Sequence, residues 1–443
     1  MLLHPSFAVN DAGHLTIGSL DAVELSKTFG TPTYYLDLDA VRAQCRMYRA
    51  AFAAHFGVNA FPVFAGKSLC FRKLYRVMAE EQMCADCVSP GELYTAHTAG
   101  FPMERVFFHG NNKMDADLRY AVELGVWHIV VDGPDELYAL ETIAAERQRQ
   151  VSILLRITPG IDPHTHRTPG IDPHTHRKIL TGNVDSKFGM AILTGQALSF
   201  VREALSMTHL TVEGFHCHIG SQIFTAAPFV DAAEIMLAFL RKVYDKTGYM
   251  ASVLNLGGGF GVRYVAEDPV FEAVDCIRQL GEEIRTMCRT LSIPQPTIYM
   301  EPGRSIVAAA GATVYTVGSV KEIPGFRNYV SVDGGMPDNP RYTLYGSRYT
   351  VVHANRANAP ADFCCTLAGR CCESGDLLAE DTYIAKPKRG ELLAVLVTGA
   401  YNYSMASNYN RIPRPPVVTI ENARATVAVA RESLADLVRL DMD

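Results

Sequence analysis

Short apolar runs rich in β-branched and aromatic residues alternate with amphipathic stretches between residues 61 and 303. Eight runs of this kind occur, at 61–67, 84–89, 105–110, 128–133, 152–157, 213–220, 253–260 and 297–303. Strand-like runs that alternate with helical stretches are typical of βα units around a parallel sheet. Eight such units predict an α/β fold, specifically a (β/α)8 barrel of the TIM type.

Two of the intervening stretches carry clear helix-end signals. After the second run, Ser89 stands at a predicted N-cap, with Pro90 at the first helical position and Glu92 at the third, which is the pattern of a capping box. The apolar-periodic stretch that begins near residue 227 ends at Gly248, which is typical of a helix C-cap. Both signals support helices between the strands.

From about residue 306 the pattern changes to β-rich pieces separated by connections rich in Pro, Gly and Asn. These pieces are GATVYTVGSV, NYVSVDGG, ELLAVLVTGA and PPVVTI, and they predict a mostly antiparallel β domain. We expect residues 37–305 to form the barrel and residues 306–443 the β domain. Residues 1–36 are expected to be an N-terminal segment that joins the β domain.

The composition is that of a compact enzyme, with 48% hydrophobic and 20% charged residues in a chain of 443. A net charge of −6 without a long basic run argues against nucleic acid or an anionic membrane as a partner. No stretch approaches the roughly 18 apolar residues of a membrane span, and no signal peptide is recognisable. Eleven scattered cysteines favour reduced thiols over a disulfide framework. We therefore expect a cytoplasmic protein that binds small molecules and copies of itself.

Polar residues gather where the eight predicted strands end. They are Lys67, Asp86, His109, Asp132, Arg156, His218, Gly257 to Gly259 and Glu301. In a barrel these strand ends meet on one face, where active sites lie. Charged residues also mark ordinary strand ends and turns, so any one of them alone would carry little weight. Together they predict an active site on that face.

Three of these features suggest a pyridoxal-phosphate site. Lys67 ends an apolar strand, where burial would lower the pKa of its amine and leave it able to form a Schiff base with an aldehyde. The alternative is a surface lysine. The glycines of LGGGFG, at 256–261, expose backbone N–H groups that suit a phosphate. Glu301 could keep a pyridine nitrogen protonated.

The motifs that carry a family resemblance run through most of the chain in order. They are FAGK at 64–67, HCHIGSQ at 216–222, LGGGFG at 256–261, EPGR at 301–304, DGGM at 333–336, CESGD at 372–376 and GAYNYSMASNYN at 399–410. The chain closely resembles the diaminopimelate decarboxylase family, whose members use pyridoxal 5'-phosphate and have the alanine-racemase-like fold type. HxGSQ and EPGR mark the wider group of basic amino-acid decarboxylases, whereas CESGD with GAYxxxMxSxYN is more specific.

The resemblance implies how the cofactor is held. Lys67 would form the Schiff base, His218 would stack on the cofactor ring, and Glu301 would face the pyridine nitrogen. The other positions implied to contact the cofactor are Asp86, Ser221, Gly257, Gly258, Gly259, Gly303, Arg304 and Tyr401. No metal is expected.

The resemblance also implies the substrate contacts and a homodimer. Arg304, Arg341 and Tyr345 would bind the distal carboxylate of the substrate, and Glu373 its distal ammonium. Tyr401 would touch both cofactor and substrate, and Cys372 would be the proton donor. In this family the Cys and Glu of CESGD reach the site from the neighbouring subunit, so the active sites would be shared. The implied reaction converts meso-2,6-diaminopimelate into L-lysine and CO2, the last step of lysine biosynthesis.

Other functions remain open at this level. Decarboxylases of ornithine, arginine or carboxynorspermidine share the lysine, the histidine and EPGR, but two arginines suit a distal carboxylate that ornithine lacks. A racemase of the same fold would need a different acid and base pair. A catalytically silent regulator that binds pyridoxal phosphate would not need Cys372 and Glu373, and a packed free thiol is the bland interpretation of Cys372.

The decapeptide TPGIDPHTHR occurs twice in succession, at 158–167 and 168–177. Two copies are too few for a solenoid, and adjacent identical loops seldom preorganise a metal site from His164, His166, His174 and His176. We interpret the second copy as a loop insertion, because doubling a loop costs only about 0.6 kcal/mol.

Deletion of residues 168–177 is therefore expected to leave fold, dimer and cofactor binding unchanged, with any effect confined to substrate handling. Thermal unfolding, size-exclusion chromatography and cofactor absorbance check this expectation, with the full-length chain as the reference. A deletion variant that unfolds or loses the cofactor would show that the second copy is structural. Neither form is expected to bind zinc stoichiometrically.

Overall fold

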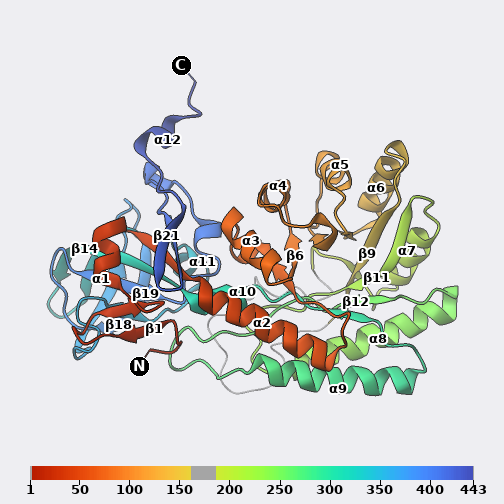
Figure 1. The fold of residues 1–443 in the computed structure, drawn as a ribbon, viewed down its shortest axis with the longest axis horizontal. Helices are drawn as coiled ribbons and strands as arrows, with labels where there is room; N and C mark the ends of the chain where they lie inside the picture. Colours follow the sequence, from red (N-terminus) through yellow and green to blue (C-terminus); the bar gives the residue numbers. More distant parts are fainter. Residues whose placement is uncertain (1, 161–185, 443) are drawn as a thin grey trace.

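Two structural regions lie side by side in the computed structural model, which describes residues 2–160 and 186–442 (Figure 1). One is a barrel with helices around it, and the other is built mainly of β-strands. Elements from both ends of the chain, drawn in red and blue, mix in the β-rich region (Figure 1). Most of the duplicated decapeptide, and all four of its histidines, lie outside the described residues.

The barrel contains the eight predicted strands, all parallel. They are β5 (Val63–Ala65), β6 (Cys84–Cys87), β7 (Val106–Phe108), β8 (His128–Val131), β9 (Val151–Thr158), β11 (Leu210–His216), β12 (Val253–Asn255) and β13 (Thr297–Tyr299). A bridge between Pro62 and Met300 joins the first strand to the last, with Val63 N–H donating to the Met300 carbonyl at 2.8 Å. The predicted TIM-type barrel is confirmed.

Helices cover the outside of the barrel because each presents an apolar stripe to the strands. They are α2 (Leu38–His55), α3 (Arg72–Glu80), α4 (Pro90–Thr98), α5 (Asp115–Leu124), α6 (Pro134–Glu146), α7 (Gln196–Leu205), α8 (Ala227–Thr247) and α9 (Ala273–Leu291). Helices α2 and α9 lie side by side along one flank, which brings the start and the end of the barrel together (Figure 1). The short strand β10 (Met190–Ala191) pairs with β9.

The predicted helix ends are largely as expected. Ser89 Oγ accepts from Glu92 N–H at 3.2 Å and caps α4. The Glu92 carboxylate accepts from Val88 N–H at 2.7 Å rather than from Ser89, so the capping box is displaced by one residue. Gly248 ends α8 with a φ of 75°, a left-handed conformation that glycine adopts without strain.

Inward-pointing side chains fill the barrel at the N-terminal end of its strands and leave the C-terminal end open. A separate apolar cluster there contains Val63, Cys84, Phe107, Val130, Leu154, Val253 and Tyr299. Trp127 packs against this cluster just before β8 begins, at the N-terminal end of the strands. Because side chains alternate along a strand, the residues after the carboxyl ends are left to line a cavity.

The β-rich region is mostly antiparallel. Its main sheet contains β4 (Thr33–Asp37), β14 (Gly311–Glu322), β15 (Asn328–Val332), β16 (Val351–His353), β17 (Phe363–Ala368), β18 (Leu377–Ile384), β19 (Leu392–Leu396), β20 (Val417–Glu421) and β21 (Arg424–Val429). The pairs β4–β20 and β15–β17 are parallel. A second, three-stranded sheet contains β1 (Phe7–Val9), β2 (Leu15–Ile17) and β3 (Leu20–Asp21), followed by α1 (Ala22–Phe29).

N-terminal strand β4 thus pairs with β14 and β20 of the C-terminal part. The exact division at residues 36 and 305 stays a prediction. Three short helices, α10 (Arg304–Val307), α11 (Arg341–Tyr345) and α12 (Leu434–Val438), complete the fold. No helix of the described residues is long and apolar enough to cross a membrane.

The two regions meet at the open end of the barrel. Tyr401, in the loop after β19, donates its backbone N–H to the Ser68 carbonyl at 2.8 Å. Ser68 follows Lys67 directly after β5, so this bond ties the β-rich region to the barrel rim. Tyr401 has a φ of 60°, which is uncommon for a residue other than glycine and is often found at functional sites.

Candidate active site

A cavity of about 570 Å³ lies where the carboxyl ends of the barrel strands face the β-rich region. Eleven of the predicted site residues line it: Lys67, His218, Ser221, Gly258, Gly259, Glu301, Gly303, Arg304, Arg341, Tyr345 and Tyr401. Four do not, namely Asp86, Gly257, Cys372 and Glu373. The size is typical of a small-molecule site.

Lys67 lies in a short turn directly after β5, and its side chain is 40% exposed because it opens into the cavity. Its Nζ is 3.7 Å from Asp86 Oδ2. Burial lowers the pKa of Lys67, but Asp86, Tyr401 and Glu301 outweigh burial and raise the pKa above its usual value. The expectation of a lowered lysine pKa is therefore wrong for the protein alone, because the sequence did not reveal the carboxylates around the amine.

Asp86 stands behind Lys67 as the third residue of β6 and is completely buried. Neither carboxylate oxygen has a hydrogen-bond partner among the described residues. Burial raises the pKa of Asp86, although His109 and Lys67 act in the opposite direction. The ion pair that Asp86 forms among the described residues is with Lys67.

The glycines after β12 allow the backbone of two strands to approach closely. A Cβ on Gly258 would lie 2.1 Å from the Glu301 carbonyl oxygen, so only glycine fits. Gly257 and Gly259 have φ of 69° and 124°. Gly257 N–H donates to Asn255 Oδ1 at 2.9 Å and Gly258 N–H to His218 Nδ1 at 3.2 Å. Two of the three N–H groups expected to hold a phosphate are thus bonded within the protein.

His218 lies two residues beyond β11 and lines the cavity. Burial, together with Lys67 and Arg156, holds its pKa well below the usual range, so the imidazole is neutral. Its Nδ1 accepts the hydrogen bond from Gly258, which places the ring proton on Nε2. A neutral, immobilised ring at the cavity wall is suited to stacking on a planar ligand.

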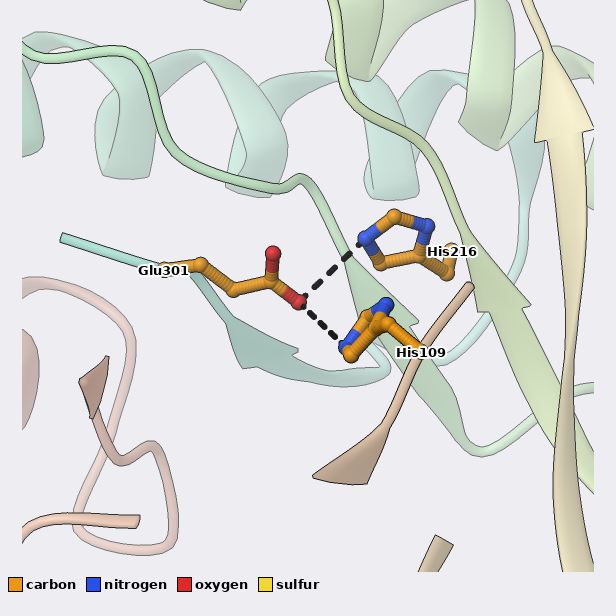
Figure 2. A group of neighbouring side chains, drawn as sticks. All are labelled: His109, His216 and Glu301. Atoms are coloured by element: carbon orange, nitrogen blue, oxygen red, sulfur yellow. Dashed lines mark ion pairs between the residues drawn. The ribbon is translucent and has the colours of Figure 1, made fainter. Parts of the chain in front are cut away.

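Glu301 follows β13, and three nitrogen atoms converge on its Oε1. Asn255 Nδ2 donates to this oxygen at 2.8 Å, His109 Nε2 lies at 3.0 Å and His216 Nε2 at 3.2 Å. Figure 2 shows both imidazoles facing the same oxygen, while the second carboxylate oxygen points away from them. Burial disfavours the charge of Glu301, but His109 and His216 outweigh it and hold the pKa of Glu301 well below its usual range.

None of these neighbours of Glu301 was predicted to have a role in the site. His109 was noted only as a strand-end residue, and His216 and Asn255 were not singled out. A signal existed for His216, because it stands two residues before His218 and side chains repeat with a period of two along a strand. Ligand atoms of His109, His216 and Glu301 lie within 4.8 Å of one another, which is also compatible with a metal ion.

Two arginines lie on the β-domain side of the cavity. The Arg304 guanidinium is 4.7 Å from the centre of the Tyr401 ring, and the Arg341 guanidinium is 5.3 Å from it. Arg304 also donates to Tyr264 Oη at 2.7 Å and to Ser221 Oγ at 3.1 Å. Arg341 lies 5.1 Å from the Tyr345 ring.

Neither arginine is neutralised within the described part of the chain. Arg304 is 7% exposed and Arg341 is 4% exposed, yet neither has a carboxylate at ion-pair distance among the described residues. The Nε atoms of both lack hydrogen-bond partners there. Because a buried charge without a partner is costly, this wall of the cavity is prepared for an anionic ligand.

Cys372 and Glu373 are exposed and lie outside the cavity of the single chain. Cys372 is anchored by its backbone, whose N–H donates to Asn410 Oδ1 at 2.8 Å. Glu373 Oε1 accepts from Gly375 N–H at 3.1 Å, within the same turn. A single chain does not bring these two residues to Lys67.

Arg156 is a further cavity residue that was noted only as a strand end. It lies 4.2 Å from the centre of the Phe188 ring and 3.8 Å from Asp132 Oδ1. Burial lowers the pKa of Arg156, with Asp132 and Glu301 acting against this effect. Its partner Phe188 stands in the sequence after the undescribed segment, so the contact could not be predicted from spacing.

Comparison with known proteins agrees with this geometry. Residues 38–308 match the family described as pyridoxal-dependent decarboxylase, pyridoxal binding domain. The chain is 44% identical to diaminopimelate decarboxylase of Bacillus subtilis (strain 168), over 100% of this chain and 98% of that protein. It is 40% identical to the Staphylococcus aureus (strain COL) enzyme of the same name, over 97% and 98%.

Solved structures give the same result. Diaminopimelate decarboxylase from M. jannaschii in complex with L-lysine superposes with a TM-score of 0.89 at 30% identity, covering 100% of this chain and 99% of that chain. The Helicobacter pylori enzyme complexed with L-lysine has a TM-score of 0.83 at 30% identity, covering 95% and 99%. The chain thus belongs to the pyridoxal-phosphate-dependent decarboxylase family, within its diaminopimelate decarboxylase group.

Proposed function

We propose that this chain removes CO2 from meso-2,6-diaminopimelate and releases L-lysine, with pyridoxal phosphate bound in the cavity. The observation that carries this proposal is the pair of buried arginines, Arg304 and Arg341, without carboxylate partners among the described residues. A substrate with a second carboxylate would neutralise them, whereas ornithine, arginine and lysine have no such group. The L-lysine bound in two related structures supports the same substrate class.

The residues around the cavity fit the cofactor. Lys67 is the amine positioned to hold its aldehyde carbon, and Ser221 with the glycine wall at Gly258 and Gly259 borders the space for its phosphate. The neutral imidazole of His218 suits one face of the ring. The Asp86 carboxylate, which has no hydrogen-bond partner among the described residues, stabilises a positive charge on the nitrogen of Lys67. When bound, pyridoxal phosphate supplies an electron sink for the electron pair left as CO2 departs.

Glu301 keeps the pyridine nitrogen protonated in this proposal. The low pKa of Glu301 makes it an anion at neutral pH, and its Oε2 is the oxygen turned away from the two histidines. An anion at this place attracts a proton to the ring nitrogen, which makes the ring a better acceptor of electrons. Gly303 and Arg304 follow directly and border the same space.

The substrate is held by groups on the opposite wall. Arg304 and Arg341 bind the distal carboxylate, with Tyr345 and Tyr401 fixing the two guanidinium planes. Glu373 binds the distal ammonium, and Cys372 donates a proton to the α-carbon after CO2 has left. Because both are remote from the cavity in one chain, they come from the partner subunit of a homodimer.

The cysteines indicate the cellular compartment of the protein. The eleven cysteines are all free thiols in the structure. Unpaired cysteines at this number are typical of a reducing compartment. We place the protein in the cytoplasm.

The substrate assignment is tested by measuring CO2 release from meso-diaminopimelate, ornithine, arginine and lysine with the cofactor present. We expect meso-diaminopimelate to exceed the other three by at least about 100-fold in kcat/KM, because only this substrate pairs both arginines. An Arg341→Leu variant should raise KM for it. Comparable rates with ornithine or arginine would contradict the proposed specificity.

Reductive trapping tests the role of Lys67. Borohydride treatment of the holoenzyme is expected to fix the cofactor on the peptide that contains Lys67, because its amine alone holds the aldehyde carbon. Mass spectrometry of the digested protein checks this. Lys187 is a matched control, since it lies close to the cavity residue Phe188, and Lys187→Ala should retain the label. Label on another lysine would disprove the assignment.

A further inference from the structure

The histidines beside Glu301 have no assigned function, although they form a deeply buried polar cluster with it. His109, directly after β7, is 3% exposed, and His216, the last residue of β11, is 1% exposed. Their ring centres are 4.7 Å apart and the rings are tilted by 67°. In Figure 2 the two rings approach one carboxylate oxygen from different sides.

The protonation of these rings follows from what they face. Burial lowers the pKa of His216 to about 3, so this ring is neutral and carries a single N–H. Its Nε2 lies 3.2 Å from an oxygen of an anion. A bare nitrogen lone pair would be repelled there, whereas an Nε2–H is attracted, and the same argument applies to His109 at 3.0 Å.

Asn255 is the third residue at Glu301 Oε1, and it links Glu301 to the glycines after β12. Its Nδ2 donates to Glu301 Oε1 at 2.8 Å while its Oδ1 accepts from Gly257 N–H at 2.9 Å. Asn255 is thus the hydrogen-bond donor to Oε1 among the described residues, and the two imidazole Nε2 atoms face the same oxygen at 3.0 and 3.2 Å. No hydrogen bond of the described residues ends on Oε2, and Glu301 lines the cavity.

We propose that His109 and His216 are positioning residues that hold Glu301 as an anion, with Oε1 facing Asn255 and the two imidazoles and Oε2 directed at the pyridine nitrogen. This inference rests on the proposed function, because it assumes that the cofactor ring reaches Glu301. Without the two N–H groups, a carboxylate in this buried place would protonate or turn, since charge without donors is costly there. The histidines thus act on the cofactor through Glu301 and do not touch the reacting atoms.

The decisive measurement compares two cofactors. Binding constants are measured for pyridoxal phosphate and for its analogue with a carbon atom in place of the pyridine nitrogen. In the wild type, pyridoxal phosphate is expected to bind at least about tenfold more tightly, because only it has a nitrogen for Glu301. In His109→Leu with His216→Leu this ratio should fall towards one. A merely structural role would weaken both cofactors equally and leave the ratio unchanged, which would overturn the inference.

Matched variants test whether the N–H group of His216 or its imidazole ring is responsible for the binding ratio. His216→Gln keeps an N–H at a comparable distance and should retain most of the ratio. His128→Leu is the control, because His128 is a completely buried histidine of the same barrel, whose nearest carboxylate, Glu213, lies 3.7 Å away. This variant should leave the ratio unchanged. Thermal unfolding of each variant records whether it folds.

A wild-type measurement serves where a leucine variant does not fold. Nitrogen NMR of histidine-labelled protein should show both His109 and His216 protonated at Nε2, and an unprotonated Nε2 on either would overturn the inference. Stoichiometric zinc binding by the cofactor-free protein, lost in the leucine variants, would also overturn it by assigning the cluster to a metal. Failure of the wild type to bind pyridoxal phosphate at all would instead disprove the proposed function.

Discussion

Replacing Cys372 by alanine is expected to lower the turnover of meso-diaminopimelate by at least about 100-fold, because general acid catalysis contributes that much or more. The absorbance of bound cofactor should stay unchanged, since Lys67, His218 and Glu301 all lie in the barrel part of the cavity. CO2 release and an absorbance spectrum of the same preparation provide the two readouts. Near-normal turnover would remove Cys372 from the mechanism.

The neighbouring cysteine offers a matched control. Cys371 is half-buried, and its backbone N–H donates to Asp376 Oδ2 at 2.7 Å. Burial raises the pKa of the Cys371 thiol to about 12, with Asp376 acting in the same direction. Cys371→Ala should therefore retain activity. If both variants lost activity equally, the loop and not the Cys372 thiol would be responsible.

Mixing two inactive variants, Lys67→Ala and Glu373→Ala, is expected to restore activity. If each site takes Lys67 from one subunit and Glu373 from the other, a hybrid dimer contains one intact site. Random exchange of equal amounts then gives about a quarter of the wild-type activity, because half of the dimers are hybrids with one of two sites intact. CO2 release is measured after mild unfolding and refolding of the mixture.

A second mixture controls for this experiment. Lys67→Ala combined with Glu301→Gln should remain inactive, because both residues line the cavity of one chain and every hybrid site keeps one defect. The comparison separates sharing of sites from repair by refolding. Absence of activity in both mixtures would argue that each site is built within a single chain.

The local signals in the sequence identified the elements because they act over a few residues. Eight apolar runs became eight barrel strands, Ser89 caps α4 and Gly248 ends α8, since periodicity and caps depend on neighbours along the chain. The position of strand ends on one barrel face brought Lys67, His218 and Glu301 together in the same way.

The sequence by itself determined the barrel, the β-rich region and about half of the residues that line the cavity. Only the tertiary structure decided how those residues are charged and oriented. It sets Asp86 behind Lys67 and so raises the lysine pKa, and it sends two histidines and Asn255 to one oxygen of Glu301. It also leaves Cys372 and Glu373 outside the cavity of their own chain. These contacts join residues from different strands, and electrostatic effects depend on distance and burial in space, which no pattern along the chain specifies.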